Sequence, residues 1–285
     1  STMLRYSIPL AFAGIIYSTV SQIDYFAIGY FGGETASAEV AEYRLAFLLA
    51  QNILLFHMAI KPVFKPIISE NLGNTDALQS RYQLAVRWVT MATIPVAITM
   101  LLAPEAYLGL FFSAKYATAG TVLVVLVCGQ LINISVGPSG KFIEGIGRTR
   151  VTFLNTVVLV GTNLILDVLL VPRLGILGAA IATATALSVV GIISLLEVHY
   201  LAEINPISST LPRIWLASLL AVCGGYALTR VFGTGLPVIL VMPVLIPLLY
   251  VTGLRTIGAF TEADRGVAES VDDRIGYEIV SKIIN

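Results

Sequence analysis

The sequence predicts an all-α integral membrane protein. Of the 285 residues, 57% are hydrophobic and only 12% are charged, whereas soluble domains carry roughly 25% charged residues. The mean hydropathy is +0.88, and apolar segments long enough to cross a bilayer as helices recur along the chain. This composition argues against a cytosolic enzyme and against a disordered regulator. The 17 basic and 17 acidic side chains balance, so the charge gives no reason to expect a nucleic acid partner.

Eight apolar segments follow one another, and each holds the roughly 20 residues that a helix needs to cross the bilayer core. They lie near residues 7–32, 42–65, 85–111, 119–138, 151–171, 174–198, 212–232 and 235–255. The first segment is too long for a cleaved signal peptide, contains Asp24 and is followed by seven more. Because the chain begins Ser1-Thr2-Met3, we expect it to be a fragment of a longer protein.

Basic residues give the expected orientation, since short loops rich in Lys and Arg stay in the cytoplasm. With the N-terminus inside, only Arg44, Lys115, Arg173 and Arg230 fall on the outer side, and the other basic residues fall on the cytoplasmic side. We therefore expect a multi-pass protein of the cell membrane with a cytoplasmic N-terminus and a cytoplasmic C-terminal tail.

The tail over 257–285 is the longest polar piece of the chain. In it, Ile275, Ile279 and Ile283 recur every four residues among charged side chains, which predicts an amphipathic helix. Such a helix either lies at the cytoplasmic membrane surface or docks a partner.

The segment near 7–32 carries polar side chains that share one face of a helix. They are Tyr17, Ser18, Ser21, Gln22, Asp24 and Tyr25. Hydroxyl and amide groups in this position form either a hydrogen-bond seam between helices or the wall of a wet cavity. The carboxylate of Asp24 favours the cavity, because an ionisable group inside a bilayer is costly unless it is paired or faces water.

The segment near 42–65 has a similar but positively charged face. Its polar residues are Arg44, Gln51, Asn52, His57, Lys61 and Lys65. His57 and Lys61 are four residues apart and so share one face of the helix. The lysine either lines a cavity or extends to the headgroups. The histidine either makes a hydrogen bond between helices or takes part in proton coupling or ligand binding.

The segment near 151–171 places Thr152, Thr156, Asn163 and Asp167 on one line of a helix. Asp167 is close to the expected outer end, where capping or pairing with Arg173 would explain it. The next segment begins with a dense run of small residues from 175 to 183, which predicts a close approach of two helices.

Several of these runs resemble a known family over roughly residues 4–200. The run Gln22-Ile23-Asp24-Tyr25-Phe26-Ala27-Ile28-Gly29 with the later Ala41-Glu42-Tyr43 resembles the helix pair that opens the C-terminal lobe of polysaccharide and lipid-linked oligosaccharide flippases. The pattern Gly145-Ile146-Gly147-Arg148, Asn155, Asn163-Leu164, Pro172-Arg173-Leu174-Gly175 and Gly178-Ala179-Ala180-Ile181-Ala182-Thr183 is similar to the signature of those members of the multidrug/oligosaccharidyl-lipid/polysaccharide exporter superfamily. Asp167 departs from this pattern, which more often has Asn there.

The resemblance implies an organisation for the chain. The family builds two six-helix lobes around a central cavity, often with two further helices. Residues 1–200 would then be the six-helix C-terminal lobe of a two-lobe flippase, 201–256 two additional transmembrane helices, and 257–285 the cytoplasmic amphipathic tail. The N-terminal lobe of the same transporter is expected to precede Ser1, and a separately encoded half-transporter is the alternative.

The resemblance also implies a function, which is to flip a polyprenyl-linked oligosaccharide or polysaccharide precursor from the cytoplasmic to the outer leaflet by alternating access. Its phosphate would bind cationic side chains, namely Arg44, Lys61 and His57. Its sugars would bind amide side chains, namely Gln22, Gln51 and Asn52. Asp24 would either pair with one of these cations or bind a coupling ion, H⁺ or Na⁺. No other cofactor is expected.

Other functions remain open on the sequence. A multidrug exporter of the same superfamily would need acidic and aromatic walls for organic cations, which the cationic face disfavours. A membrane-embedded glycosyl or phosphatidyl transferase would need clustered carboxylates, but Asp24 and Asp167 lie far apart in the sequence and no phosphate-binding glycine loop is present. Cys128 and Cys223 suggest no metal site. We therefore expect no catalytic residue and no resident metal. A scaffold subunit without a substrate is a further alternative.

Overall fold

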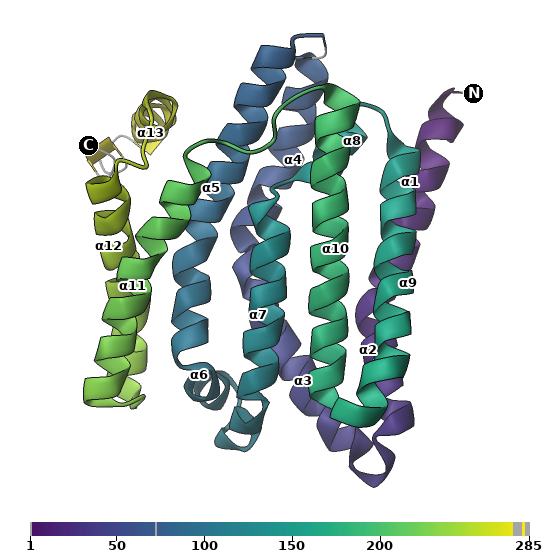
Figure 1. Cartoon of the computed structure of the whole chain (residues 1–285), viewed down its shortest axis with the longest axis vertical. Coiled ribbons are helices and arrows are strands. Elements are labelled where there is room, and N and C mark those ends of the chain that lie inside the picture. Colours follow the sequence, from purple (N-terminus) through teal and green to yellow (C-terminus); the bar gives the residue numbers. More distant parts are fainter. Residues whose placement is uncertain (1, 72, 276–280, 283–285) are drawn as a thin grey trace.

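The computed structural model describes residues 2–71, 73–275 and 281–282, and these form a helical bundle with no strand (Figure 1). The α-helices are α1 (Thr2–Ser18), α2 (Val20–Phe31), α3 (Ala36–Gln51), α4 (Leu55–Glu70), α5 (Thr75–Leu102), α6 (Pro104–Phe111), α7 (Gly120–Ser135), α8 (Ser139–Gly145), α9 (Thr149–Leu174), α10 (Ile176–Ala202), α11 (Leu211–Phe232), α12 (Leu236–Ile257) and α13 (Glu262–Ile275). Seven helical stretches among the described residues are long and apolar enough to cross a membrane. The predicted all-α membrane fold is confirmed.

The first predicted segment, near 7–32, is not one helix, and this expectation is corrected. It is divided into α1 and α2 at Thr19. The hydroxyls of Ser18 and Thr19 donate hydrogen bonds of 2.7 Å to the carbonyl oxygens of Ile15 and Ile16. Such bonds from side chain to backbone compete with the helical pattern and bend helices.

The second predicted segment is also interrupted. A short 3₁₀ turn, Asn52–Leu54, separates α3 from α4. The side-chain amide of Asn52 donates to the carbonyl oxygens of Leu48 and Leu49, at 3.1 and 3.3 Å. Both of the first two predicted segments therefore contain a break where the chain can change direction.

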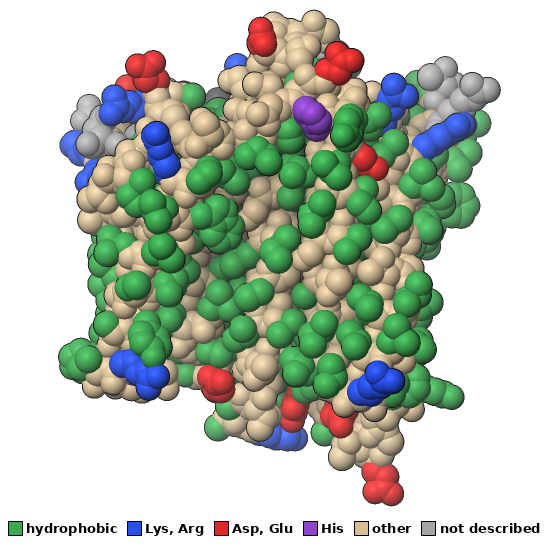
Figure 2. All heavy atoms as spheres, viewed as in Figure 1, with side chains coloured by type: hydrophobic (Ala, Val, Ile, Leu, Met, Phe, Trp, Pro, Cys, Tyr) green, Lys and Arg blue, Asp and Glu red, His purple; other side chains and the backbone are tan. Residues whose placement is uncertain are grey.

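The surface of the molecule has the pattern of a membrane protein. In Figure 2, hydrophobic side chains cover the middle of the visible face, and Lys, Arg, Asp and Glu gather at its two ends. Large apolar side chains such as Phe12, Ile165 and Leu240 are exposed by more than half of their surface. Lipid tails can cover such a band, whereas water would not favour it.

Helix α10 packs between α7 and α9 (Figure 1). A Cβ atom built on Gly129 of α7 would lie 2.5 Å from the Cα of Ala184 of α10. A Cβ on Gly178 would lie 2.6 Å from the backbone of Leu170 in α9. The predicted close approach at the small residues is thus confirmed, because only glycine leaves room for backbones at this distance.

Helices α11 and α12 pack against each other and against α5, at the edge of the bundle opposite α9 (Figure 1). Their buried residues Ala217, Met242 and Ile246 join the same apolar core as Ile94 of α5. The start of α1 and helix α13 lie at the same end of the molecule (Figure 1). Helix α13 covers the first part of the predicted tail helix, and Ile279 and Ile283 lie outside the described residues.

Candidate functional site

Four helices meet at the carboxylate of Asp24, which is fully buried in α2. The hydroxyl of Tyr43 in α3 donates to Oδ2 at 2.5 Å, and the hydroxyl of Thr183 in α10 donates to the same oxygen at 2.8 Å. The side-chain amide of Asn163 in α9 donates to Oδ1 at 3.0 Å. These donors hold the carboxylate in one position in the interior of the bundle.

A second carboxylate completes this group. Asp167 follows Asn163 by one helical turn, is fully buried and interacts electrostatically with Asp24. Among the described residues, no hydroxyl or N–H group donates to the carboxylate of Asp167, whose one hydrogen-bond contact is with the carboxylate of Asp24, and Oδ1 of Asn163 has no partner. We call Asp24, Tyr43, Asn163, Asp167 and Thr183 the Asp24 cluster.

The chemistry of the Asp24 cluster suits a small cation. Buried polar atoms are nearly always hydrogen-bonded, and two adjacent buried carboxylates can share a hydrogen bond only when a proton or another cation lies between them. Carboxylate, amide and hydroxyl oxygens are the ligands of hard cations, and a buried carboxylate can also take up a proton. The cluster therefore fits a proton or a monovalent cation.

The sequence analysis treated the members of this cluster separately. It named Asp24 as an ion-coupling or charge-pairing residue, and no Lys or Arg among the described residues forms a salt bridge with it. It expected Asp167 to cap a helix or to pair with Arg173, but Asp167 is buried beside Asp24 and Arg173 is exposed. Tyr43 and Thr183 were not proposed as site residues. One sequence feature could have indicated the cluster: Asn163, Asp167 and Thr183 are polar residues in otherwise apolar helices.

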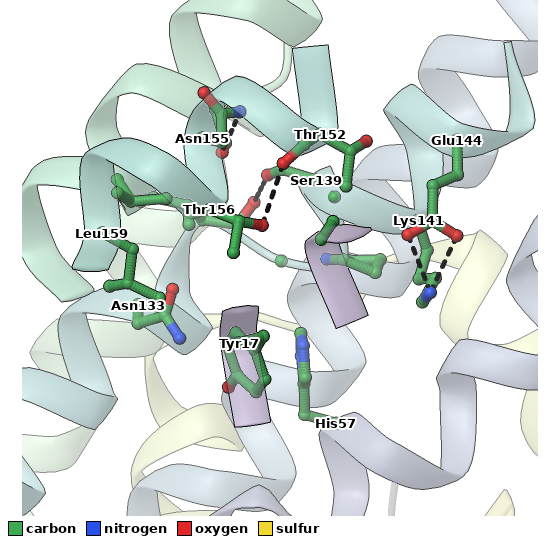
Figure 3. A pocket seen from close by; sticks show the side chains of 18 of the residues that line it. Tyr17, His57, Asn133, Ser139, Lys141, Glu144, Thr152, Asn155, Thr156 and Leu159 are labelled. Carbon is green, nitrogen blue, oxygen red and sulfur yellow. Dashed lines mark hydrogen bonds and ion pairs between the residues drawn. The ribbon is translucent and has the colours of Figure 1, made fainter. Parts of the chain in front are cut away.

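A polar cavity of about 450 Å³ lies within the bundle, between α1, α4, α7, α8, α9 and α10 (Figure 3). Its size lies in the range of about 300–1,000 Å³ that is usual for small-molecule sites. The polar side chains that line it are Tyr17, His57, Asn133, Ser139, Lys141, Glu144, Thr152, Asn155, Thr156 and Ser194.

The charges of this cavity are balanced. The ammonium group of Lys141 lies 2.8 and 2.7 Å from the two carboxylate oxygens of Glu144 (Figure 3). On the opposite wall, the amide of Asn155 donates to Oγ of Ser194 at 3.2 Å and to Oε2 of Glu197 at 2.5 Å. The cavity thus offers hydroxyl, amide and carboxylate oxygens and carries no excess positive charge from Lys141.

The structure does not gather the predicted substrate-binding residues in this cavity. Of them only His57 lines it, and His57 is buried. Gln22, Arg44, Gln51 and Asn52 are exposed and lie outside its lining. The side chain of Lys61 lies outside the described part of the structure. The assignment of these six residues to a glycan phosphate and its sugars stays a prediction.

Comparison with protein families gives one match, in which a family model described as MatE matches residues 9–169. Two similar curated proteins come from Haloferax volcanii. The chain is 25% identical over 201 residues to a probable low-salt glycan biosynthesis flippase, Agl15, covering 70% of this chain and 41% of the relative. It is 27% identical over 179 residues to a probable flippase, AglR, covering 61% of this chain and 37% of the relative. The chain thus spans less than half the length of these relatives.

Two solved structures are similar in fold. The lipid II flippase MurJ in an inward closed conformation matches with a TM-score of 0.65 and 18% identity, over 85% of this chain and 52% of that one. A multidrug resistance MATE family transporter in an outward-facing conformation matches with a TM-score of 0.57 and 15% identity, over 96% of this chain and 71% of that one. At these identities the similarity shows the shared membrane fold.

Proposed function

The chain belongs to the MatE family, and from that premise we propose that it forms part of a transporter that flips a polyprenyl-linked glycan. The transporter would move the glycan from the cytoplasmic to the outer leaflet by alternating access. The name of Agl15, a probable low-salt glycan biosynthesis flippase, supports a glycan as the substrate, and the name of AglR, a probable flippase, supports flipping. The match to about half of a lipid II flippase supports a second lobe as the partner of this one.

The observation that carries an ion-coupled transport function is the Asp24 cluster. Two carboxylates, Asp24 and Asp167, lie side by side in the interior of a membrane-embedded bundle. Retaining two buried acids in this position is costly unless a cation or proton accompanies them. Alternate occupancy of the cluster by H⁺ or Na⁺ would change its net charge and so bias the packing of α2 against α3, α9 and α10.

The substrate contacts in this proposal lie on the open faces of the lobe. Arg44, Gln22, Gln51 and Asn52 are exposed, so they are free to face a second lobe and a substrate between the lobes. An anionic pyrophosphate would favour Arg44 and Lys61 as partners, and amide side chains suit sugar hydroxyls.

The proposal is tested with the complete gene product reconstituted in proteoliposomes, by following a fluorescent polyprenyl-pyrophosphate oligosaccharide from one leaflet to the other. Asp24→Asn keeps the size of the side chain but removes its charge, and we expect it to reduce the flipping rate at least tenfold. Arg44→Ala and Lys61→Ala are expected to weaken the apparent affinity for the substrate, because each removes a charge-assisted contact with phosphate.

The matched control is Asp76→Asn, which removes an exposed carboxylate at the start of α5 and should flip at the wild-type rate. No flipping by folded wild-type protein would refute glycan transport, and efflux of organic cations would then favour a multidrug exporter. Wild-type flipping by Asp24→Asn would refute the coupling role of the Asp24 cluster. Unchanged substrate affinity in Arg44→Ala and Lys61→Ala would refute only their assignment.

A further inference from the structure

The helix pair α1 and α2, helix α9 and helix α10 carry the same order of features along their length. In the first helix pair, Gly14 and Tyr17 line the polar cavity, Val20 lies in an apolar cluster, and Asp24 lies in the Asp24 cluster. The spacing from Val20 to Asp24 is one helical turn, which corresponds to about 6 Å.

Helices α9 and α10 repeat this order. In α9, Asn155 and Thr156 line the cavity, Leu159 lies at its wall and in the apolar cluster, and Asn163 follows one turn later in the Asp24 cluster. In α10, read in the opposite direction, Ser194 lines the cavity and Leu187 lies in the apolar cluster. Since α9 and α10 run antiparallel, their matching layers lie at the same depth.

The apolar cluster between the two polar regions is small. It consists of Val20, Leu159, Ala186 and Leu187, with Val160 and Val190 packed against it. All four are buried, so the layer is a thin dry partition, which we call the apolar seal. Apolar constrictions of this kind block ions because water does not wet them, and they open when the side chains move apart.

We infer that the polar cavity is the path by which the coupling cation reaches the Asp24 cluster, and that the apolar seal is its gate. This inference rests on the proposed ion coupling. The side-chain oxygens of Asn133, Asn155 and Ser194 along the cavity can solvate a cation on its way. The cavity lies towards the end of the molecule that carries α8, α13 and the start of α1 (Figure 1), the end predicted to be cytoplasmic.

The break between α1 and α2 at Thr19 is the hinge at which the gate would open. Val20 of the apolar seal is the first residue of α2 and directly follows Thr19. Rotation at this junction would shift Val20 from Leu159 while Asp24 moves with the same short helix. Occupancy of the Asp24 cluster and opening of the apolar seal are thereby linked through α2.

The test measures access to the Asp24 cluster with a small cationic thiol reagent, 2-aminoethyl methanethiosulfonate. It uses the complete gene product with its native cysteines replaced by Ser. Thr183→Cys places a thiol in the Asp24 cluster, and Ser194→Cys places one in the cavity. We expect the thiol at 194 to react quickly and the thiol at 183 to react at least about 100-fold more slowly, because the seal excludes water.

Leu159→Ala removes the largest part of the seal on α9, and we expect it to speed the reaction at 183 about tenfold or more. Leu154→Ala on the same helix is the control, since Leu154 is 58% exposed on the outer surface, and it should change nothing. Gly14→Phe adds a ring where a Cβ meets no atom within 4 Å, and it should reverse the effect of Leu159→Ala by filling the cavity.

Slow reaction of the thiol at 194 would overturn the water-filled path. Equal rates at 183 in Leu159→Ala and Leu154→Ala would overturn the gate. If Leu159→Ala does not fold, Leu187→Ala makes the same test from α10. The labelling needs no glycan, so a loss of flipping with the expected labelling pattern would count against the proposed substrate and leave the path supported.

Discussion

The hydroxyl of Tyr43 donates a hydrogen bond of 2.5 Å to Oδ2 of Asp24, and both side chains are fully buried. This bond joins α2 to α3, which follow each other across a short connection. The ring of Tyr43 also packs edge-on against Tyr25 and stacks on Phe47. One residue therefore fixes both the position of a buried carboxylate and the packing of the aromatic side chains around it.

Tyr43→Phe should separate these two roles. The ring contacts remain, but Asp24 loses a donor, which we expect to lower the free energy of unfolding by about 1–3 kcal/mol. The measurement is thermal unfolding in detergent. Tyr30→Phe is the control, because Tyr30 is 82% exposed, and it should leave the midpoint unchanged. Equal midpoints for the two variants would show that the hydrogen bond does not stabilise the fold.

Asp167→Asn should stabilise the cation-free protein and weaken the response of its stability to Na⁺ and pH. The amide can donate to Asp24 or to Oδ1 of Asn163, which no described residue satisfies, so the cation-free protein should gain about 1 kcal/mol of stability. The variant should also lose most of the change in stability that Na⁺ or pH produces in the wild type. The measurement is the unfolding midpoint across Na⁺ concentrations and pH values. A variant that is less stable and equally responsive to both would contradict a cation site at Asp167.

Gly129→Ala should destabilise the contact between α7 and α10. Its Cβ would lie 2.5 Å from Ala184, so the helices must move apart at a cost of about 1–3 kcal/mol. The matched control is Gly161→Ala in α9, where a Cβ meets nothing within 4 Å; the usual preference of helices for alanine should make it neutral or slightly stabilising. Unfolding midpoints of both variants decide this, and similar shifts would argue against backbone contact at Gly129.

Asp264→Asn should release helix α13 from the bundle. The carboxylate of Asp264 forms a buried salt bridge with Arg87 of α5, and its Oδ1 accepts from Nε1 of Trp88 at 3.0 Å. Its Oδ2 also accepts from the backbone amide of Thr261 at 2.7 Å. Removing one partner of a buried pair leaves the other charge uncompensated, which costs about 3–5 kcal/mol.

The measurement for Asp264→Asn is limited proteolysis, which should cut the connection between α12 and α13 faster than in the wild type. Asp273→Asn, at an exposed position near the end of α13, is the control and should be cut at the wild-type rate. Equal cleavage of both variants would mean that the Arg87 contact does not hold the helix.

Part of the fold follows from local sequence. Apolar length predicted spans that correspond to α5, α7, α9, α10, α11 and α12, because a span depends only on consecutive side chains and the thickness of the bilayer. It did not predict α8, nor the division of the segment near 85–111 into α5 and α6 at Ala103. The breaks at Thr19 and Asn52 were missed, since they depend on whether a side chain bonds to its own helix or elsewhere. The polar face of the first segment drew attention to Asp24 and that of the second to His57, and both side chains are buried.

The sequence by itself determined that this is a helical membrane protein, and it showed the resemblance to glycan flippases. Only the tertiary structure decided that Asp24 meets Asn163, 139 positions along the chain, and that Asp167 is not a partner of Arg173. It alone also placed the apolar seal between the cavity and the Asp24 cluster. The physical reason is that helical periodicity determines on which face of a helix a side chain lies. Which other side chains it contacts depends on how helices distant in the sequence pack together.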